Sequence, residues 1–221
     1  MSSRVAACGL ILSILFCATD TTPAEGWAAI VAATDRSDNP ALLSLMAEID
    51  LDGQEEICRA LGRRQDPYVG DVLSALASDA ARKGGFRAEY LLRVLLASIL
   101  DEPQNRVEAN EEALGALAQQ MPAYEDAQIE GSLIQVLPML KIENRAQLLM
   151  AAGSRIVARL RRSEGLLDPP HHAVALEFLG AVLRMPNSAL ADPCVDIIRN
   201  SRAKDLVERA RAAIRALPRG G

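Results

Sequence analysis

The chain has 221 residues, half of them hydrophobic and 24% charged, with a formal net charge of −5 and few aromatic residues (three Phe, three Tyr and one Trp). This composition is typical of a globular protein and excludes a disordered one. The 37 Ala and 31 Leu residues argue against a β-sandwich or β-barrel, in which β-branched and aromatic residues form the strand pairs.

Residues 1–24 are predicted to be a signal peptide. Arg4 gives the segment a positive start, and residues 5–18 form an uncharged apolar run that is too short to cross a membrane as a helix. The small residues Thr22 and Ala24 suit cleavage after Ala24, which would leave a mature chain that begins at Glu25. The segment therefore predicts an exported protein of the periplasm or cell envelope.

Two alternatives for the same segment stay open. A bacterial lipoprotein signal ends in a cysteine that receives lipid, and Cys17 stands at the end of the apolar run. Lipidation there would make the protein a membrane-anchored lipoprotein, although Phe16 is bulkier than the residue that usually precedes such a cysteine. The other alternative is an uncleaved helix that is buried or anchors the chain.

From Glu25 onward the apolar residues recur every three to four positions, as at Leu92, Leu95, Leu96 and Ile99, which predicts an all-α chain. Asp or Asn before Pro, as in Asp168-Pro169, marks several helix starts. Helices are expected near residues 25–36, 40–49, 53–63, 67–82, 86–101, 104–120, 124–139, 143–163, 170–184, 189–200 and 203–217. Short connections between them favour antiparallel pairs within one domain, residues 25–221.

The last predicted helix carries a family resemblance. Residues 205–217 resemble the second helix of a HEAT repeat, with approximate matches at Asp205, Val207, Arg209, Ala210, Ala213 and Leu217, and residues 66–76 resemble a first helix of that kind. Arg209 stands one position later than usual. The resemblance implies a right-handed HEAT-like or armadillo-like solenoid across residues 38–217, a class of protein that binds other macromolecules. The tetratricopeptide pattern is absent, and Trp27 is the only tryptophan.

Motifs for nucleotide binding, serine hydrolysis and metalloprotease chemistry are missing, so no catalytic residue, metal or cofactor is expected. His171 and His172 are adjacent near a helix start, where neighbouring side chains point about 100° apart and seldom share a metal. The alternative function is an enzyme on a helical scaffold, with carboxylates or these histidines as acid–base groups in a deep cleft. Acidic pairs stand near helix ends or on outer faces, where solvation or the helix dipole explains them: Glu55-Glu56, Asp101-Glu102, Glu111-Glu112 and Glu125-Asp126.

Two cysteines follow the predicted signal peptide, Cys58 and Cys194. Both stand in apolar helical patterns, and an elongated fold would hold them too far apart for a disulfide. We expect two buried free thiols that pack as small hydrophobic residues.

Charge is divided unevenly along the sequence. Residues 19–140 hold 9 basic and 21 acidic groups, whereas residues 141–221 hold 14 basic and 8 acidic groups. Arg155, Arg159 and Arg162 are spaced to form a stripe along one helix face. The predicted binding residues for an anionic partner are Arg155, Arg159, Arg162, Arg202, Arg209 and Arg215.

Three interpretations of the basic residues compete: solvated faces with scattered ion pairs, a surface for an anionic partner, and association between acidic and basic parts. The function favoured by the sequence is a non-catalytic binding or scaffold protein of the bacterial cell envelope, which binds another protein or an anionic envelope component. A purely structural subunit is a third hypothesis. Nucleic acid is not an expected partner, because aromatic residues for base stacking are scarce. If the stripe proved to be paired with buried acids, reversing its charges would unfold the chain and the stripe would lose its value as a binding surface.

Overall fold

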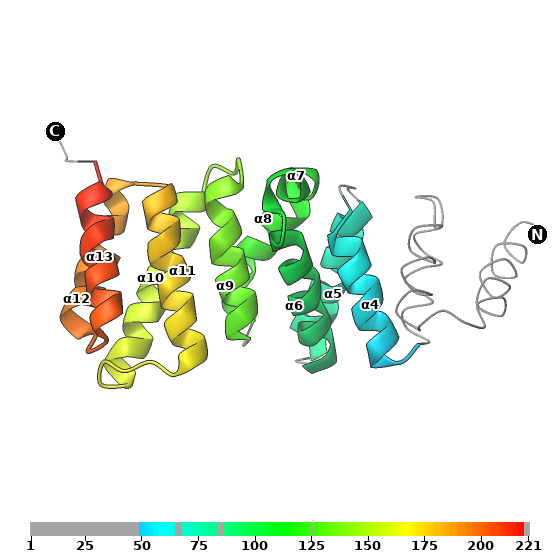
Figure 1. Ribbon diagram of the computed structural model, residues 1–221, viewed down its shortest axis with the longest axis horizontal. Helices are drawn as coiled ribbons and strands as arrows, with labels where there is room; N and C mark the ends of the chain where they lie inside the picture. The colour runs from blue at the N-terminus through cyan, green and yellow to red at the C-terminus, as the bar shows by residue number, and fades with distance from the viewer. Residues whose placement is uncertain (1–48, 65–67, 84–85, 125, 219–221) are drawn as a thin grey trace, which may run out of the picture. The chain divides into compact units, whose positions relative to one another are not determined.

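The computed structural model describes residues 49–64, 68–83, 86–124 and 126–218, and every regular element in these ranges is helical (Figure 1), which confirms the all-α prediction. The predicted signal peptide, Cys17 and the helix expected at 25–36 lie outside the described residues, as does all but the last residue of the helix expected at 40–49. Among the described helices, none combines the length and the apolar character that a membrane span needs. The chain divides into two compact units after Ala109.

The first unit contains α4 (Leu51–Gly62), α5 (Tyr68–Lys83), α6 (Phe86–Leu100) and α7 (Pro103–Ala109). Helix α6 is the central element, because α4, α5 and α7 all pack against it. The Asp50 carboxylate begins α4 by accepting a 2.9 Å hydrogen bond from the Gly53 N–H. Gly62 lets α4 approach α6 closely, since a Cβ atom at this position would clash with Ser98 Cβ and lie 3.0 Å from the Leu95 carbonyl oxygen.

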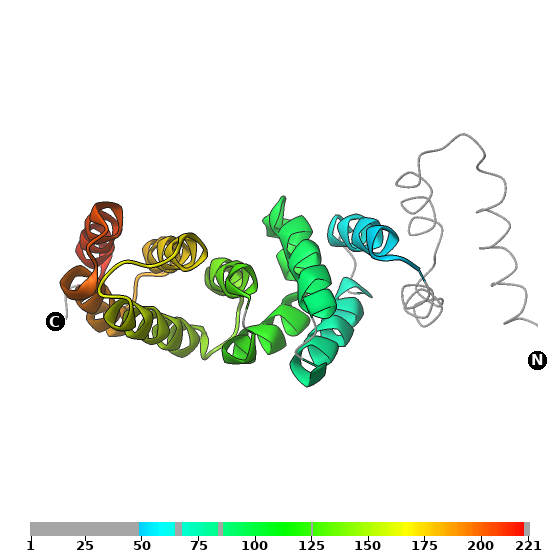
Figure 2. The same cartoon turned by 90° about the horizontal axis from the view of Figure 1, so that it is seen from below.

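The described residues of the second unit form the helices α8 (Glu111–Gln119), α9 (Ala127–Val136), α10 (Arg145–Arg162), α11 (Pro169–Arg184), α12 (Ala191–Asn200) and α13 (Lys204–Ala216). Short 3-10 helices flank them at η2 (Met121–Ala123), η3 (Leu137–Met139) and η4 (Ser188–Leu190). Helices α9, α11 and α13 form one layer in which α11 packs against both neighbours, and α10 and α12 pack together in a second layer (Figure 2). Across the layers α10 packs on α11 and α12 packs on α13.

Local sequence explains where these helices begin and how closely they pack. Asp168 begins α11, because its carboxylate accepts the His171 N–H at 3.2 Å and Pro169 needs no partner for its own nitrogen. Gly165 has a φ of +88°, a conformation that suits glycine, and a Cβ there would lie 2.5 Å from the Asn200 carbonyl oxygen. Gly153 lets α10 meet both α11 and α12, since its Cβ would lie 2.7 Å from Phe178 Cζ and from Pro193 Cβ.

The expected boundaries differ from the observed ones at particular residues. The single helix predicted at 104–120 is two helices, because Asn110 leaves the helical conformation with φ −120° and ψ 20°. Asn followed by two glutamates is a helix-start pattern, so the sequence held this signal. The helix predicted at 124–139 gives way to the turn η3, where Pro138 offers no N–H for a helical hydrogen bond.

Candidate functional site

Glu130, in α9, is a buried carboxylate that binds two of the predicted stripe arginines. Its side chain is only 4% exposed, and Arg155 Nε donates to its Oε1 at 2.9 Å while Arg159 Nη1 donates to its Oε2 at 2.6 Å. Both arginines come from α10 and are about one quarter exposed, at 26% and 23%. Two charge-assisted hydrogen bonds to one buried acid therefore tie α9 to α10.

This cluster changes the meaning of the predicted stripe. Arg155 and Arg159 are both held in the fold by Glu130, which offsets one of their two positive charges, whereas Arg162 is exposed and makes no ion pair with another described residue. The sequence reasoning missed Glu130. Its signal was nonetheless present, because Leu133, Ile134 and Leu137 follow it at spacings of three, four and seven, which places a carboxylate on the apolar face of α9.

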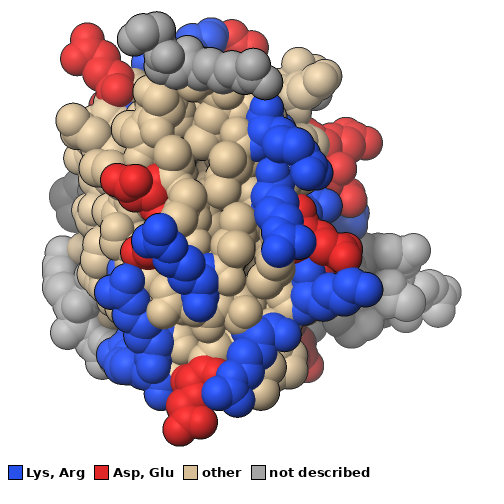
Figure 3. Space-filling model, turned by 90° about the vertical axis from the view of Figure 1, so that its left-hand side faces the viewer, with Lys and Arg blue, Asp and Glu red and all other residues tan. Residues whose placement is uncertain are grey.

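Several other arginines of the second unit are exposed and form no ion pair with any described acidic residue: Arg162, Arg184, Arg202, Arg209, Arg211 and Arg215. Two acids of α12 and α13 have other partners. Asp196 binds Arg161 at 3.0 Å, and Glu208 lies 3.8 Å from Lys204. Figure 3 looks onto the α12–α13 end of this unit and shows rows of basic side chains with uncharged surface between them. Four predicted binding residues, Arg162, Arg202, Arg209 and Arg215, belong to this set.

The two adjacent histidines bind different aspartates. His171 Nδ1 lies 2.5 Å from an Asp168 carboxylate oxygen on its own helix, and His172 Nε2 lies 2.7 Å from Asp205 Oδ2 at the start of α13. Each hydrogen bond favours the charged form of its carboxylate, so His171 lowers the pKa of Asp168 and His172 lowers the pKa of Asp205. In the part of the chain that the structure describes, no three His, Cys, Asp or Glu side chains gather as metal ligands would.

The acidic pairs have local partners. Glu55 accepts from Tyr90 Oη and Arg59, which lowers its pKa, with the Tyr90 hydrogen bond as the largest cause. Glu102 binds Arg106 at 2.8 Å. Glu111 accepts the Lys141 N–H, and Asp126 accepts the Gln128 N–H at 2.7 Å to begin α9. At least one described member of each acidic pair therefore binds another side chain or accepts a backbone N–H.

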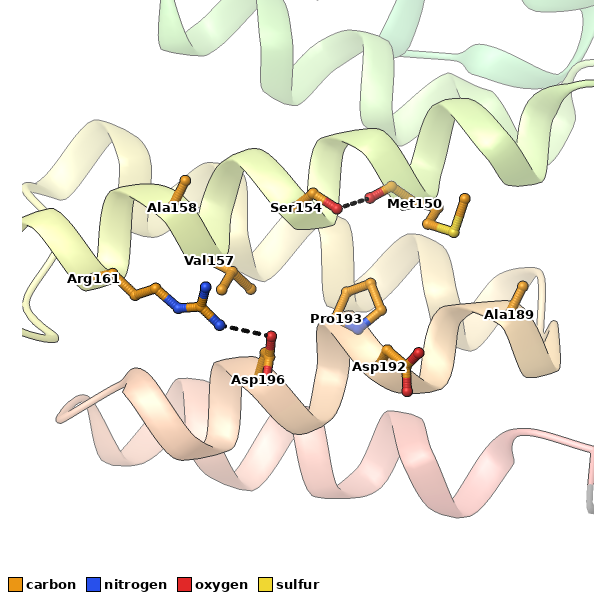
Figure 4. Close-up of a pocket in the computed structure, with 9 residues that line it drawn as sticks. All are labelled: Met150, Ser154, Val157, Ala158, Arg161, Ala189, Asp192, Pro193 and Asp196. Atoms are coloured by element: carbon orange, nitrogen blue, oxygen red, sulfur yellow. Dashed lines mark hydrogen bonds and ion pairs between the residues drawn. The ribbon is translucent and has the colours of Figure 1, made fainter.

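A hollow of about 320 Å³ lies between α10 and α12 (Figure 4). Its floor includes Val157 and Pro193, Met150 stands at its edge with 39% of its surface exposed, and the Arg161–Asp196 ion pair closes one side. Neither histidine lines this hollow.

Cys58 in α4 and Cys194 in α12 are both fully buried and free, as predicted. Burial disfavours the charged thiolate and raises the pKa of each thiol to about 12. The two cysteines are therefore unreactive packing residues, one in each unit.

Comparison of the chain with protein-family models, with characterised proteins and with solved structures gave no match.

Proposed function

We propose that this chain is a non-catalytic binding or scaffold protein of the bacterial cell envelope, built as a HEAT-like right-handed solenoid. Two features support the architecture. Within the second unit, consecutive helices alternate between two layers, with α9, α11 and α13 in one and α10 and α12 in the other. Residues 205–217, which resemble a HEAT second helix, form most of α13.

The observation that carries the binding function is the set of exposed arginines without acidic partners. Arg162, Arg202, Arg209 and Arg215 are exposed, and no described carboxylate forms an ion pair with them. Unpaired charges of one sign create a field that attracts an oppositely charged partner. The partner proposed here is an acidic protein of the envelope. Arg155 and Arg159 are left out of this surface, because both donate hydrogen bonds to the buried Glu130 and are only about one quarter exposed.

A charge-removal experiment tests this proposal. The four arginines are changed to Ser together, and partner capture from envelope extracts is compared with the wild-type chain at low and high salt. We expect the wild type to retain an acidic protein that is released by salt, and the variant to lose it, because surface electrostatics are screened by salt.

The matched control replaces Arg199 and Lys204, which are exposed but lie 3.9 Å and 3.8 Å from Asp196 and Glu208. This control should capture the same protein as the wild type. Equal capture by the wild type, the control and the four-residue variant would show that these arginines do not bind the partner.

The proposed location of the protein in the cell envelope is tested by identifying its first residue and any lipid on Cys17. A mature chain that begins at Glu25 supports export with cleavage, and a lipid on Cys17 supports the membrane-anchored alternative. A purified protein that still begins at Met1 and carries no lipid contradicts both.

The alternative function, an enzyme with carboxylate and histidine acid–base groups, has one observation in its favour. His172 and Asp205, from different helices, lie 2.7 Å apart in the arrangement by which a carboxylate orients a general base. Replacing His172 with Gln should abolish any hydrolytic activity found by substrate screening. An activity that survives this change does not use the pair.

A further inference from the structure

Arg184 and Arg209 converge over Gly180 in the second unit. A Cβ atom built on Gly180 would lie 3.7 Å from Arg184 Nη1 and 3.6 Å from Arg209 Nη2. The two nitrogen atoms are thus at most 7.3 Å apart, the sum of their distances from that one point. Arg184 stands in the last turn of α11 and Arg209 in α13, so two neighbouring helices of one layer supply the two guanidinium groups.

No described acid neutralises either arginine. Asp205, one turn before Arg209, is the carboxylate that helix geometry would offer it, but Asp205 binds His172 at 2.7 Å. Among the residues that the structure describes, Arg184 donates only to the Gln135 carbonyl oxygen, at 3.5 Å. Two like charges are therefore held near one another without a counter-charge, an arrangement that an anion between them would stabilise.

Partly exposed apolar residues stand near the two arginines in the sequence of both helices. Leu176 and Leu183 stand four residues before and three residues after Gly180, on the same face of α11, and both are partly exposed. On α13, Ala212 and Ala216 follow Arg209 at spacings of three and seven. Apolar surface next to two cations suits a carboxylate on a segment that also carries apolar side chains.

We propose that Arg184 and Arg209 form a clamp for one carboxylate of an acidic, amphipathic segment of the partner protein, whose apolar side chains lie over the partly exposed Leu176 and Leu183. The inference rests on the proposed function and names its site. Arginine suits this role because its planar donors match a carboxylate. Glu177 stands three residues before Gly180 and forms no ion pair with another described residue. Its negative charge would repel a second carboxylate of the bound segment.

The test measures binding of a fluorescein-labelled helical peptide of about 15 residues, with Leu and Glu on one face, by fluorescence anisotropy at low salt. A second peptide has Gln in place of every Glu. R184A and R209A should each weaken the Glu peptide about tenfold, as expected for loss of one hydrogen bond to a charged group. The double variant should be weaker than either single variant, because it loses the hydrogen bonds of both arginines, and the two losses should not be simply additive since both arginines bind one group.

Three controls accompany these variants. R199A and R211A remove exposed arginines that belong neither to the clamp nor to the four-arginine set, and each should change the affinity by no more than about twofold, an effect of general charge alone. E177Q should tighten binding about twofold or more, because it removes a like charge near the carboxylate. All variants keep the core intact, so circular dichroism should show unchanged helix content.

The other outcomes distinguish failure of the clamp from failure of the proposed function. If R184A and R209A bind as the wild type does while the four-arginine variant fails, the clamp is wrong and the proposed function stands. If the wild type binds neither peptide but binds phosphatidylglycerol vesicles, the proposal of a carboxylate clamp is wrong and the anionic partner is a lipid. If the wild type binds no acidic peptide and captures no envelope protein, both proposals are overturned.

Discussion

Arg155 Nε in α10 lies 2.9 Å from the carboxylate of Glu130 in α9, whose side chain is only 4% exposed. Arg159 binds the other carboxylate oxygen at 2.6 Å. Because the carboxylate is withdrawn from water, it depends on the two guanidinium groups for its stabilisation. Leaving a buried charge without partners costs more than replacing the whole group by apolar side chains.

Removing both arginines should therefore destabilise the second unit. The double variant R155A/R159A is expected to lower the free energy of unfolding by about 3 kcal/mol, measured by urea denaturation with circular dichroism. Adding E130L to the double variant should recover much of the loss, since no buried charge then remains. R162A should stay within about 0.5 kcal/mol of the wild type, and an equal loss in R162A would contradict the assignment.

Gly153 is expected to be intolerant of any side chain. A Cβ atom there would lie 2.7 Å from Phe178 Cζ and Pro193 Cβ, so G153A must push α10 away from its neighbours. We expect a net loss of about 2 kcal/mol in thermal or urea unfolding. The matched control is G131A in α9, whose Cβ would lie at an ordinary 3.7 Å from Val174 Cγ2 and should stabilise the helix by about 0.5 kcal/mol. Equal effects of the two changes would rule out close packing as the reason for Gly153.

The pKa of Asp205 should depend on His172. The hydrogen bond from His172 lowers the pKa of Asp205 in the folded chain below its ordinary value of 3.8. A carboxyl group with a lowered folded pKa stabilises the fold above its ordinary pKa, and this contribution is lost as the pH falls through the folded value. Carboxyl carbon NMR should show the lowered pKa in the wild type and a rise toward 3.8 in H172A, with the pKa of Asp168 unchanged because its partner is His171. An Asp205 pKa that does not respond to H172A would exclude the hydrogen bond in solution.

The thiols should report the unfolding of the two units separately. Cys58 and Cys194 are fully buried, and their pKa is raised to about 12, so iodoacetamide at pH near 8 should modify neither in the native protein. In rising urea, mass spectrometry of the labelled peptides should show each cysteine react only when its own unit opens. Rapid labelling of either thiol without denaturant would mean that its unit opens readily or packs differently.

Much of the fold was predictable because helices depend on local spacing. The apolar period and the Asp–Pro starts gave the positions of α5, α6, α10, α11 and α13 to within a few residues. The boundary at Asn110 was missed, although Asn before two glutamates is a start pattern, because the apolar period runs on through it. The expectation of a single repeat domain from residue 25 to 221 stays a prediction.

The sequence by itself determined the helical class, the unequal division of charge and the burial of the two cysteines, because each depends on composition and on spacing within one helix. Only the tertiary structure decided which charges remain free. Glu130 lies 25 and 29 residues from the arginines that it binds, and His172 binds an aspartate 33 residues away. Such pairs depend on which helices become neighbours, and the packing of α11 beside α13 brings Arg184 and Arg209 together over Gly180, with no described acid in an ion pair with either.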